Sequence, residues 1–148
     1  MTNLKEILAD YPAHFDVKVA WGEMDAALHV NNTVYLRYAE SGRIDYFEKM
    51  GFRVNVTNTE PSVGPILAEI QCKYKAPVTF PDQLVVATRL QPGSLDVYSF
   101  WVEQLIVSQQ LQRVVAEVKA RLVAYDYQQK QKAPIPDELI AKLSQASG

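Results

Sequence analysis

The stretch that decides the fold is "NNTVYLRYAESGRIDYFEKMG", residues 31–51. Its apolar and small residues recur at spacings of three and four, the period of an amphipathic helix, and they are Tyr35, Tyr38, Ala39, Gly42, Tyr46 and Met50. Asn31 or Asn32 can cap the helix, and Gly51 can end it. The sequence therefore predicts a helix of about four turns with one apolar stripe. We expect its remaining faces to carry Arg37, Glu40, Arg43, Asp45, Glu48 and Lys49.

Gly42 stands in the middle of that apolar stripe. A glycine inside a helix costs about 1 kcal/mol relative to alanine. Close approach by a neighbouring sheet would offset this cost, because only glycine leaves the necessary room. We therefore expect a sheet to pack directly against the helix at Gly42.

Strand-like patterns lie on both sides of the helix. Before it, residues 14–21, "HFDVKVAW", alternate with Phe15, Val17, Val19 and Trp21 on one face. After it, four runs have strand character: Pro65–Lys75, Leu84–Leu90, Leu95–Val107 and Val114–Tyr125. The last two runs are separated by a short link, which predicts an antiparallel hairpin. In the final run, one face is expected to carry Val114, Ala116, Val118, Ala120, Leu122 and Ala124.

The remaining segments complete a single domain over residues 1–148. Short helices are expected at residues 4–9 and in the tail that Pro136 and Asp137 open, and an irregular crossing is expected at residues 52–61. The order is strand, long helix and four strands. The economical arrangement is an α+β fold in which an antiparallel sheet of about five strands curls around one long helix.

The composition excludes several classes of protein. The 148 residues suit one ordinary domain, and a net charge of −2 argues against binding nucleic acid through overall positive charge. No run approaches roughly 18 apolar residues, and the first residues lack a basic segment followed by an apolar one, so we expect no membrane partner. Cys72 is the only cysteine, which we interpret as a packed core thiol in a reducing cytoplasm. The sequence predicts neither a metal site nor a cofactor.

Asp25 and His29 lie just ahead of the predicted helix, in "WGEMDAALHVNN", residues 21–32. The chain has no nucleophile elbow, P-loop, dinucleotide fingerprint or HExxH motif. The first N–H groups of a helix are unpaired and carry the positive end of its dipole. A carboxylate beside them either stabilises the helix as a charge near the cap or serves acyl transfer as a general base or nucleophile. The residues alone leave both interpretations open.

The run "WGEMDAALHVNNTVYLRYAESGR", residues 21–43, resembles the hotdog-fold acyl-CoA thioesterases of the 4-hydroxybenzoyl-CoA thioesterase class. It is also similar to the motif of plant acyl-ACP thioesterases. The matching features are an aspartate after the first strand, then "HVNN", and then "YLRY" followed by an acid and an arginine. The resemblance places Asp25 at the family's catalytic carboxylate and Asn32 where a backbone N–H polarises the thioester carbonyl.

The motif departs from the family at two positions. Ala27 stands where the acyl-ACP type has an asparagine, and Leu28 stands where many relatives have glycine or another small or polar residue. Asp25 is therefore the main catalytic candidate, as base or nucleophile. His29 matches the histidine of the acyl-ACP type, and it either orients a water or the acyl carbonyl or serves only for packing.

The resemblance implies hydrolysis of an acyl-CoA, or of an acyl-ACP, to a free acid and a thiol. Candidates for holding the CoA phosphates are Lys73, Lys75 and Arg89, with Arg53 and Arg121 as further basic residues. Family members pair their sheets edge to edge with active sites at the interface, so a homodimer or homotetramer is implied. Glu40 and Arg43, three residues apart, are expected to form a surface ion pair.

Two alternatives to a thioesterase remain. One is a hotdog-fold enoyl-CoA hydratase or dehydratase, in which an aspartate and a histidine would move protons at a double bond. The other is a non-catalytic acyl-CoA-binding protein that has kept the fold.

Overall fold

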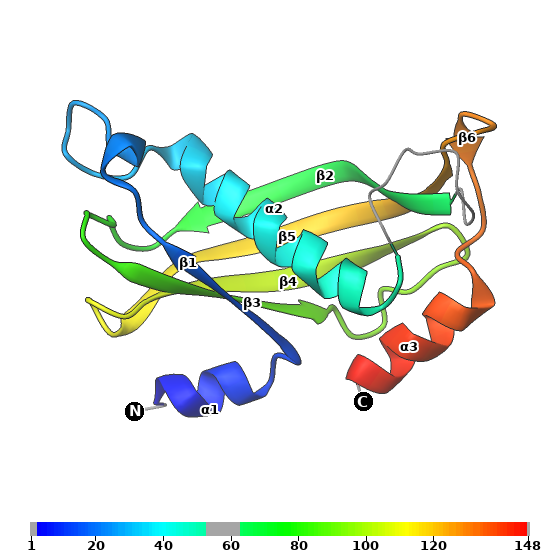
Figure 1. Cartoon of the computed structure of the whole chain (residues 1–148). Coiled ribbons are helices and arrows are strands. Elements are labelled where there is room, and N and C mark those ends of the chain that lie inside the picture. Colours follow the sequence, from blue (N-terminus) through cyan, green and yellow to red (C-terminus); the bar gives the residue numbers. More distant parts are fainter. Residues whose placement is uncertain (1–2, 53–62, 148) are drawn as a thin grey trace.

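The computed structural model describes residues 3–52 and 63–147, and it has an antiparallel sheet curled around a central helix (Figure 1). This confirms the α+β class expected from the sequence. In chain order the elements are α1 (Leu4–Ala9), β1 (Ala13–Lys18), the 3-10 helix η1 (Trp21–Glu23), α2 (Asn32–Lys49), β2 (Val63–Tyr74), β3 (Gln83–Leu90), β4 (Ser99–Ser108), β5 (Arg113–Asp126), β6 (Gln131–Lys132) and α3 (Asp137–Ser147).

The five long strands lie in the order β1-β3-β4-β5-β2, and β6 pairs with the end of β5. The expected hairpin of β4 and β5 is confirmed. The strand expected from Leu95 begins only at Ser99, because residues before it turn: Ser94 N–H donates to Gln91 O, and Asp96 N–H donates to Ser99 O. Both terminal helices are confirmed. The crossing expected at residues 52–61 lies, beyond Phe52, outside the described residues.

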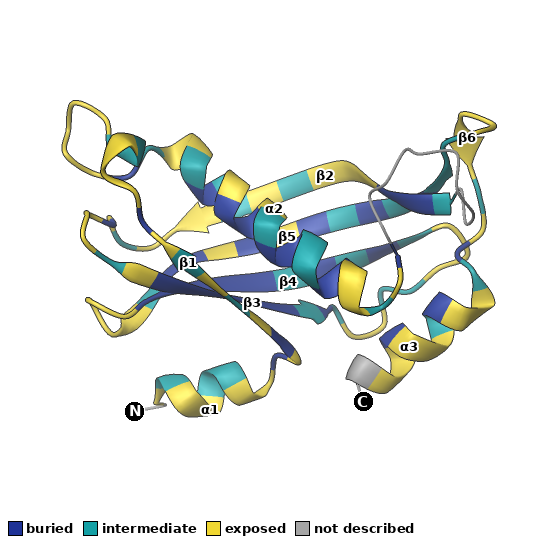
Figure 2. Ribbon diagram, in the orientation of Figure 1, coloured by how far each residue is buried: buried dark blue, intermediate teal, exposed yellow. Residues whose placement is uncertain are grey.

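Helix α2 lies in the concave face of the sheet (Figure 2). Most of the expected stripe is buried, and Met50 is half-buried. The buried members are Tyr35, Tyr38, Ala39, Gly42 and Tyr46, together with Phe47. A Cβ at Gly42 would lie 2.5 Å from Val86 Cγ1 on β3, so the close approach of the sheet is confirmed. The glycine therefore lets the helix sit deep in the curl.

Arg43 corrects the prediction of a surface ion pair with Glu40. It is only 5% exposed, and its Nη1 donates to Oε1 of Gln104 at 3.1 Å. Gln104 Nε2 in turn donates to Ala39 O at 2.8 Å and to Thr88 Oγ1 at 3.0 Å. Burial lowers the pKa of the guanidinium, and the charge of Glu40 partly offsets this. Within residues 3–52 and 63–147 the two side chains form no ion pair.

The first strand is shorter than predicted. It ends at Lys18, and Trp21, expected on its inner face, is 67% exposed in η1. The reason is local: Glu23 Oε1 accepts the Ala20 N–H at 2.7 Å, and Glu23 N–H donates to Ala20 O at 3.0 Å. This turn rotates the backbone before Trp21, which ends the alternation of the strand.

The convex face of the sheet is also covered, in part by α1. Leu4, Ile7 and Leu8 pack on a buried cluster of Tyr11, Val85, Ala87, Leu105 and Val107. Strands β3 and β4 are therefore buried on both faces, which explains their unbroken apolar runs. In β5 the expected alternation holds from Ala116 to Ala124 but is wrong at its start, because a register shift opposite Ile106 and Val107 turns Val115 inward instead of Val114.

Cys72 is half-buried on β2, so the prediction of a core thiol holds only in part. Burial raises the pKa of its thiol. In the described parts of the chain, no helix is both long and apolar enough to span a bilayer.

Candidate active site

The chain between β1 and α2 forms a tight turn around Asp25. Asp25 N–H donates to His29 O at 3.0 Å, and Leu28 N–H donates to Asp25 O at 2.9 Å. Met24 and Val30 form a β-bridge that closes this turn. Leu28 has a φ of 61°, a left-handed conformation that favours glycine. The geometry therefore explains why a glycine suits this position in the resembling motif.

The Asp25 carboxylate is exposed but held by two hydrogen bonds. Ala27 N–H donates to Oδ1 at 2.9 Å, and Asn31 Nδ2 lies 3.5 Å from Oδ2. The first bond needs only the backbone of residue 27, so the alanine found there does not disturb it. The second links the carboxylate to the residue that caps α2.

Asn31, rather than Asn32, is the N-cap of α2. Its Oδ1 accepts from Thr33 N–H at 2.9 Å and from Thr33 Oγ1 at 2.7 Å. Asn32 is the first helical residue, and no hydrogen bond from its N–H is found among residues 3–52 and 63–147. The amide lies at the positive end of an 18-residue helix, where an anionic oxygen is favoured.

Glu23 connects the Asp25 turn to α2 by hydrogen bonds, a role that the sequence did not predict. Its Oε1 accepts from Tyr38 Oη at 2.7 Å, and its backbone oxygen accepts from Asn31 N–H at 3.0 Å. Burial, together with the hydrogen bond to Glu23, raises the pKa of Tyr38 far above its usual value. The only local signal was a glutamate three residues after Ala20, at the position from which a side chain can reach back to the N-cap N–H. Its contact with Tyr38 is tertiary.

A cleft of about 380 Å³ opens beside the N-terminus of α2. Tyr74 Oη donates to Asn32 O at 3.0 Å, and the Tyr74 ring meets the Tyr35 ring edge-on at 5.1 Å between centroids. Tyr35 Oη donates to Ala76 O and accepts from Val78 N–H. Tyr35 thus does more than the packing expected of it. The residues lining the cleft are His29, Val30, Asn32, Tyr35, Tyr74, Lys75, Ala76 and Pro77.

The structure brings the predicted catalytic residues together only in part. His29 and Asn32 line the cleft, whereas Asp25 is not among its lining residues and is joined to the helix cap through Asn31. The His29 side chain is exposed, and within the described residues it forms no hydrogen bond; only its backbone oxygen does. Asn31 therefore connects the carboxylate to the helix start, a role that sequence reasoning missed.

The three phosphate candidates differ in position. Lys75 lines the cleft, with its Nζ 3.7 Å from Glu117 Oε2. Lys73 is exposed on β2, in register with Glu117. Arg89 lies elsewhere, because its Nε is 3.0 Å from Glu103 Oε1 and its guanidinium lies 4.3 Å from the centre of the Tyr11 ring. Only Lys75 borders the cleft. Residues 3–52 and 63–147 contain no cluster of His, Cys, Asp and Glu suited to a metal ion.

Comparison with known proteins identifies the family. A profile of the thioesterase-like superfamily matches residues 19–143. Long-chain acyl-CoA thioesterase FadM of Escherichia coli (strain K12) is 28% identical over 130 residues, covering 87% of this chain and 95% of FadM. The chloroplastic acyl-acyl carrier protein thioesterase ATL2 of Arabidopsis thaliana is 29% identical over 112 residues, 75% of this chain. The chain spans only 57% of that plant protein.

Solved structures agree on the fold. The PA2801 protein of Pseudomonas aeruginosa superposes with a TM-score of 0.78 at 28% identity, covering 89% of this chain and 98% of that protein. The profile covers most of the sequence, including the Asp25 turn, α2 and strands β2 to β6, and it begins just after β1. The chain therefore belongs to the thioesterase-like superfamily of hotdog-fold thioester hydrolases.

Proposed function

We propose that this protein hydrolyses an acyl-CoA thioester to a carboxylic acid and free CoA at the N-terminus of α2. The observation that carries the proposal is that the Asn32 N–H, which has no hydrogen-bond partner in the described part of the chain, lies at the helix start to which Asn31 ties the Asp25 carboxylate. The amide supplies a donor for the oxyanion, and Asp25 supplies the base or nucleophile. His29 lies at the edge of the cleft, where it can orient the water or the acyl group.

In the general-base route, Asp25 takes a proton from water while the water oxygen attacks the thioester carbon. The carbonyl oxygen becomes negative and accepts a hydrogen bond from the Asn32 N–H. The C–S bond then breaks, and the proton passes from Asp25 to the leaving thiolate. In the nucleophilic route, Asp25 attacks the thioester carbon, the C–S bond breaks, and the CoA thiolate leaves a mixed anhydride behind. Water then hydrolyses the anhydride to the acid and an ionised Asp25, and the proton released goes to the thiolate. Both routes end with the acid, the thiol and an ionised Asp25.

Two features favour CoA as the carrier. The FadM relative, which is a long-chain acyl-CoA thioesterase by name, is matched over 95% of its length. Lys75 borders the cleft with an exposed side chain that can meet a phosphate. Acyl-ACP, named in the plant relative, is the second carrier to test. The reducing cytoplasm expected from the single cysteine stays a prediction.

The outer edge of β2 supports the proposed homodimer. β2 is the last strand of the sheet, and three of its large apolar residues are exposed: Ile66 at 40%, Leu67 at 43% and Tyr74 at 48%. An unpaired edge of this kind favours pairing with another strand. Antiparallel pairing of β2 with its copy brings the partner's strand beside Tyr74 and the cleft. A homotetramer built from two such dimers is a further prediction.

The proposal is tested by incubating the purified protein with short, medium, long and aromatic acyl-CoAs and following free thiol. We expect release from at least one of them. Asp25→Asn should lower kcat/KM by about 10²- to 10⁴-fold. Asp96→Asn is the matched control, because Asp96 is also exposed and also accepts a backbone N–H, from Val97 at 2.8 Å. It should leave the rate unchanged.

Two results would reject the proposal. Binding of acyl-CoA without thiol release would indicate a non-catalytic binding protein. Release that survives unchanged in Asp25→Asn would remove Asp25 from the mechanism. A single turnover in ¹⁸O water then separates the two routes, since only the nucleophilic route places label in the Asp25 carboxylate.

A further inference from the structure

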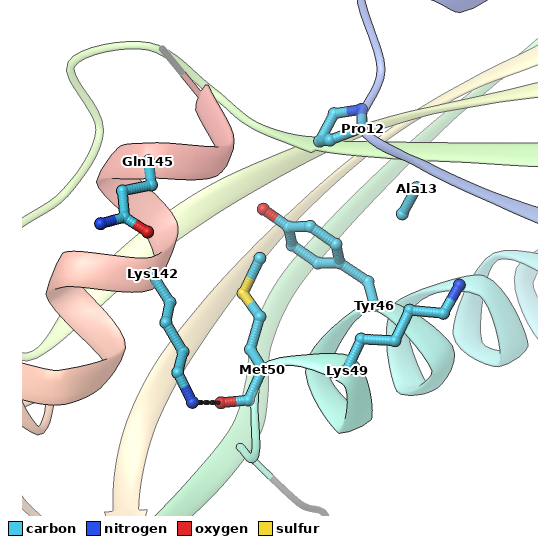
Figure 3. Close-up of a pocket in the computed structure, with 7 residues that line it drawn as sticks. All are labelled: Pro12, Ala13, Tyr46, Lys49, Met50, Lys142 and Gln145. Atoms are coloured by element: carbon cyan, nitrogen blue, oxygen red, sulfur yellow. Dashed lines mark hydrogen bonds between the residues drawn. The ribbon is translucent and has the colours of Figure 1, made fainter.

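A second cleft lies at the opposite end of α2 from Asp25 (Figure 3). It has a volume of about 390 Å³ and lies between the start of β1, the last turn of α2 and α3. An 18-residue helix is about 27 Å long, so this cleft is well separated from the Asn32 amide. Its lining residues are Pro12, Ala13, Tyr46, Lys49, Met50, Lys142 and Gln145.

The Tyr46 hydroxyl is a buried donor with no acceptor. The residue is 2% exposed, and its hydroxyl oxygen has no hydrogen-bond partner among the described residues. Burial raises the pKa of Tyr46 to about 12, so the hydroxyl keeps its proton at neutral pH. The Leu90 amide on the sheet partly offsets this rise, but an amide N–H only donates and leaves the tyrosine proton unpaired. Buried polar groups without partners are rare in native proteins.

That hydroxyl points into the cleft. Figure 3 shows it directed toward the space between Gln145 and the end of the Met50 side chain. Gln145 carries both an acceptor and donors, and in Figure 3 its amide oxygen lies on the side toward Tyr46 while its nitrogen points away. Lys142 Nζ donates to Met50 O at 3.2 Å, which leaves two of its three N–H groups for another acceptor. The donors available at the cleft are therefore the Tyr46 hydroxyl and the Lys142 ammonium.

The side chains of the cleft carry a formal charge of about one positive unit, set beside the partly negative C-terminal end of α2. The Lys49 ammonium turns toward Asp45, with its Nζ 2.9 Å from Oδ2, so these two charges cancel. Lys142 remains, with only the neutral Met50 carbonyl as its recorded partner in the described chain. A single net positive charge suits a monoanion better than a phosphate dianion. Pro12, Ala13 and Met50 add an apolar wall, which suits an organic ligand.

We propose that this cleft binds a small monocarboxylic acid as its anion. One carboxylate oxygen accepts the Tyr46 proton, and the Lys142 ammonium turns from Met50 O to the carboxylate. The apolar part of the ligand lies against Pro12, Ala13 and Met50. Acids released by thioester hydrolysis are one source of such a ligand, and other cellular acids are a second. The site itself does not depend on the proposed activity.

The test is a titration of the ¹⁵N-labelled full chain with octanoate and, separately, with benzoate, followed by amide chemical shifts. We expect saturable shifts at Ala13, Met50 and Gln145 with at least one of the two acids, and the stronger response identifies an aliphatic or an aromatic ligand. Octan-1-ol and inorganic phosphate should bind at least tenfold more weakly. Phosphate that binds as tightly as the acids would overturn the proposal, as would shifts confined to Asn32 and Tyr74 in the first cleft.

Two variants test the named contacts. Tyr46→Phe should weaken binding about tenfold or more, because a hydrogen bond to a charged group is lost. Its melting temperature without ligand should not fall, since the substitution removes an unpaired hydroxyl. Lys142→Gln changes an exposed side chain and should also weaken binding, whereas Lys5→Gln on α1 is the control. Octanoate or benzoate that binds Tyr46→Phe and Lys142→Gln as tightly as the original chain would refute the site.

Discussion

At its N-terminal end, α2 meets exposed polar residues that are held mainly through backbone hydrogen bonds, whereas its C-terminal half is enclosed by aromatic rings. Asp25, His29 and Asn32 are exposed. Phe47 is 2% exposed, and the centre of its ring lies 5.8 Å from the ring centre of Phe52 and 5.9 Å from that of Phe100. The buried half anchors the helix, and the exposed end presents an amide to solvent. Stability and chemistry should therefore respond to different substitutions.

The largest effect on stability is expected at the enclosed end. Phe100 is fully buried, and truncation of a buried phenylalanine to alanine typically costs about 3–5 kcal/mol. Phe100→Ala should lower the free energy of unfolding by this amount, as measured by urea denaturation. At low temperature, where the variant is still folded, kcat/KM should stay within about twofold. A large loss of kcat/KM with normal stability would contradict the separation of the two ends.

Gly42→Ala tests the close contact between α2 and strand β3 of the sheet. The new methyl would lie 2.5 Å from Val86 Cγ1, and overpacking of this kind costs about 1–3 kcal/mol, while alanine regains about 1 kcal/mol of helix propensity. The net loss of stability in urea denaturation should therefore be up to about 2 kcal/mol. Gly22→Ala is the matched control, since a Cβ there meets nothing within 4 Å. A Gly42→Ala variant as stable as Gly22→Ala would show that α2 can shift without cost.

The sequence predicted the helix because periodicity is a local signal. Gly42 in the stripe and an asparagine at the cap follow from spacing alone, and the structure confirms both. Arg43 was placed wrongly because its burial depends on Gln104, which is 61 positions away. Trp21 was placed wrongly because the Glu23 side chain starts a turn that alternation cannot reveal.

The candidate site shows the same limit. The position of Asp25 ahead of a helix was visible in the sequence, since it depends only on order along the chain. The contribution of Tyr74 was not, because Tyr74 reaches Asn32 O only after β2 has crossed beside α2. The left-handed backbone at Leu28 was also hidden, since leucine gives no sign of a positive φ. Local order predicts which groups are present, and tertiary contacts decide which of them meet.

Asn31 contributes both to stability, because it caps α2, and to the candidate site, because it contacts Asp25. Asn31→Ala should cost about 1 kcal/mol of stability, the usual effect of losing a cap. Asn31→Asp keeps an oxygen for Thr33 N–H but removes the donor to Asp25 Oδ2 and adds a like charge beside it. We expect Asn31→Asp to keep its melting temperature and to lose activity, with the pH profile of kcat/KM moved to higher pH. If activity falls only in proportion to stability in both Asn31→Ala and Asn31→Asp, then Asn31 acts only as a helix cap.

The smallest effect is expected at Leu28, where strain and site coincide. A non-glycine residue in the left-handed region costs about 1–2 kcal/mol of stability, which glycine would recover. Glycine also makes the unfolded chain more flexible, and this lowers stability by about 0.4–1 kcal/mol. Leu28→Gly should therefore stabilise the protein by about 0.5–1 kcal/mol in urea denaturation. Lys130→Gly is the matched control, because Lys130 has a φ of 55° in the turn between β5 and β6.

Both glycine variants relieve similar strain, so a difference in kinetics between them reports on the Leu28 side chain itself. That side chain is 65% exposed on the turn between Asp25 and His29. Leu28 exposes a hydrophobic side chain and has a strained backbone, so we expect its side chain to contact the bound substrate. We expect Leu28→Gly, but not Lys130→Gly, to raise KM for acyl-CoA by a few-fold at nearly constant kcat. Equal values of kcat and KM in the two variants would show that the Leu28 side chain does not contribute to substrate binding.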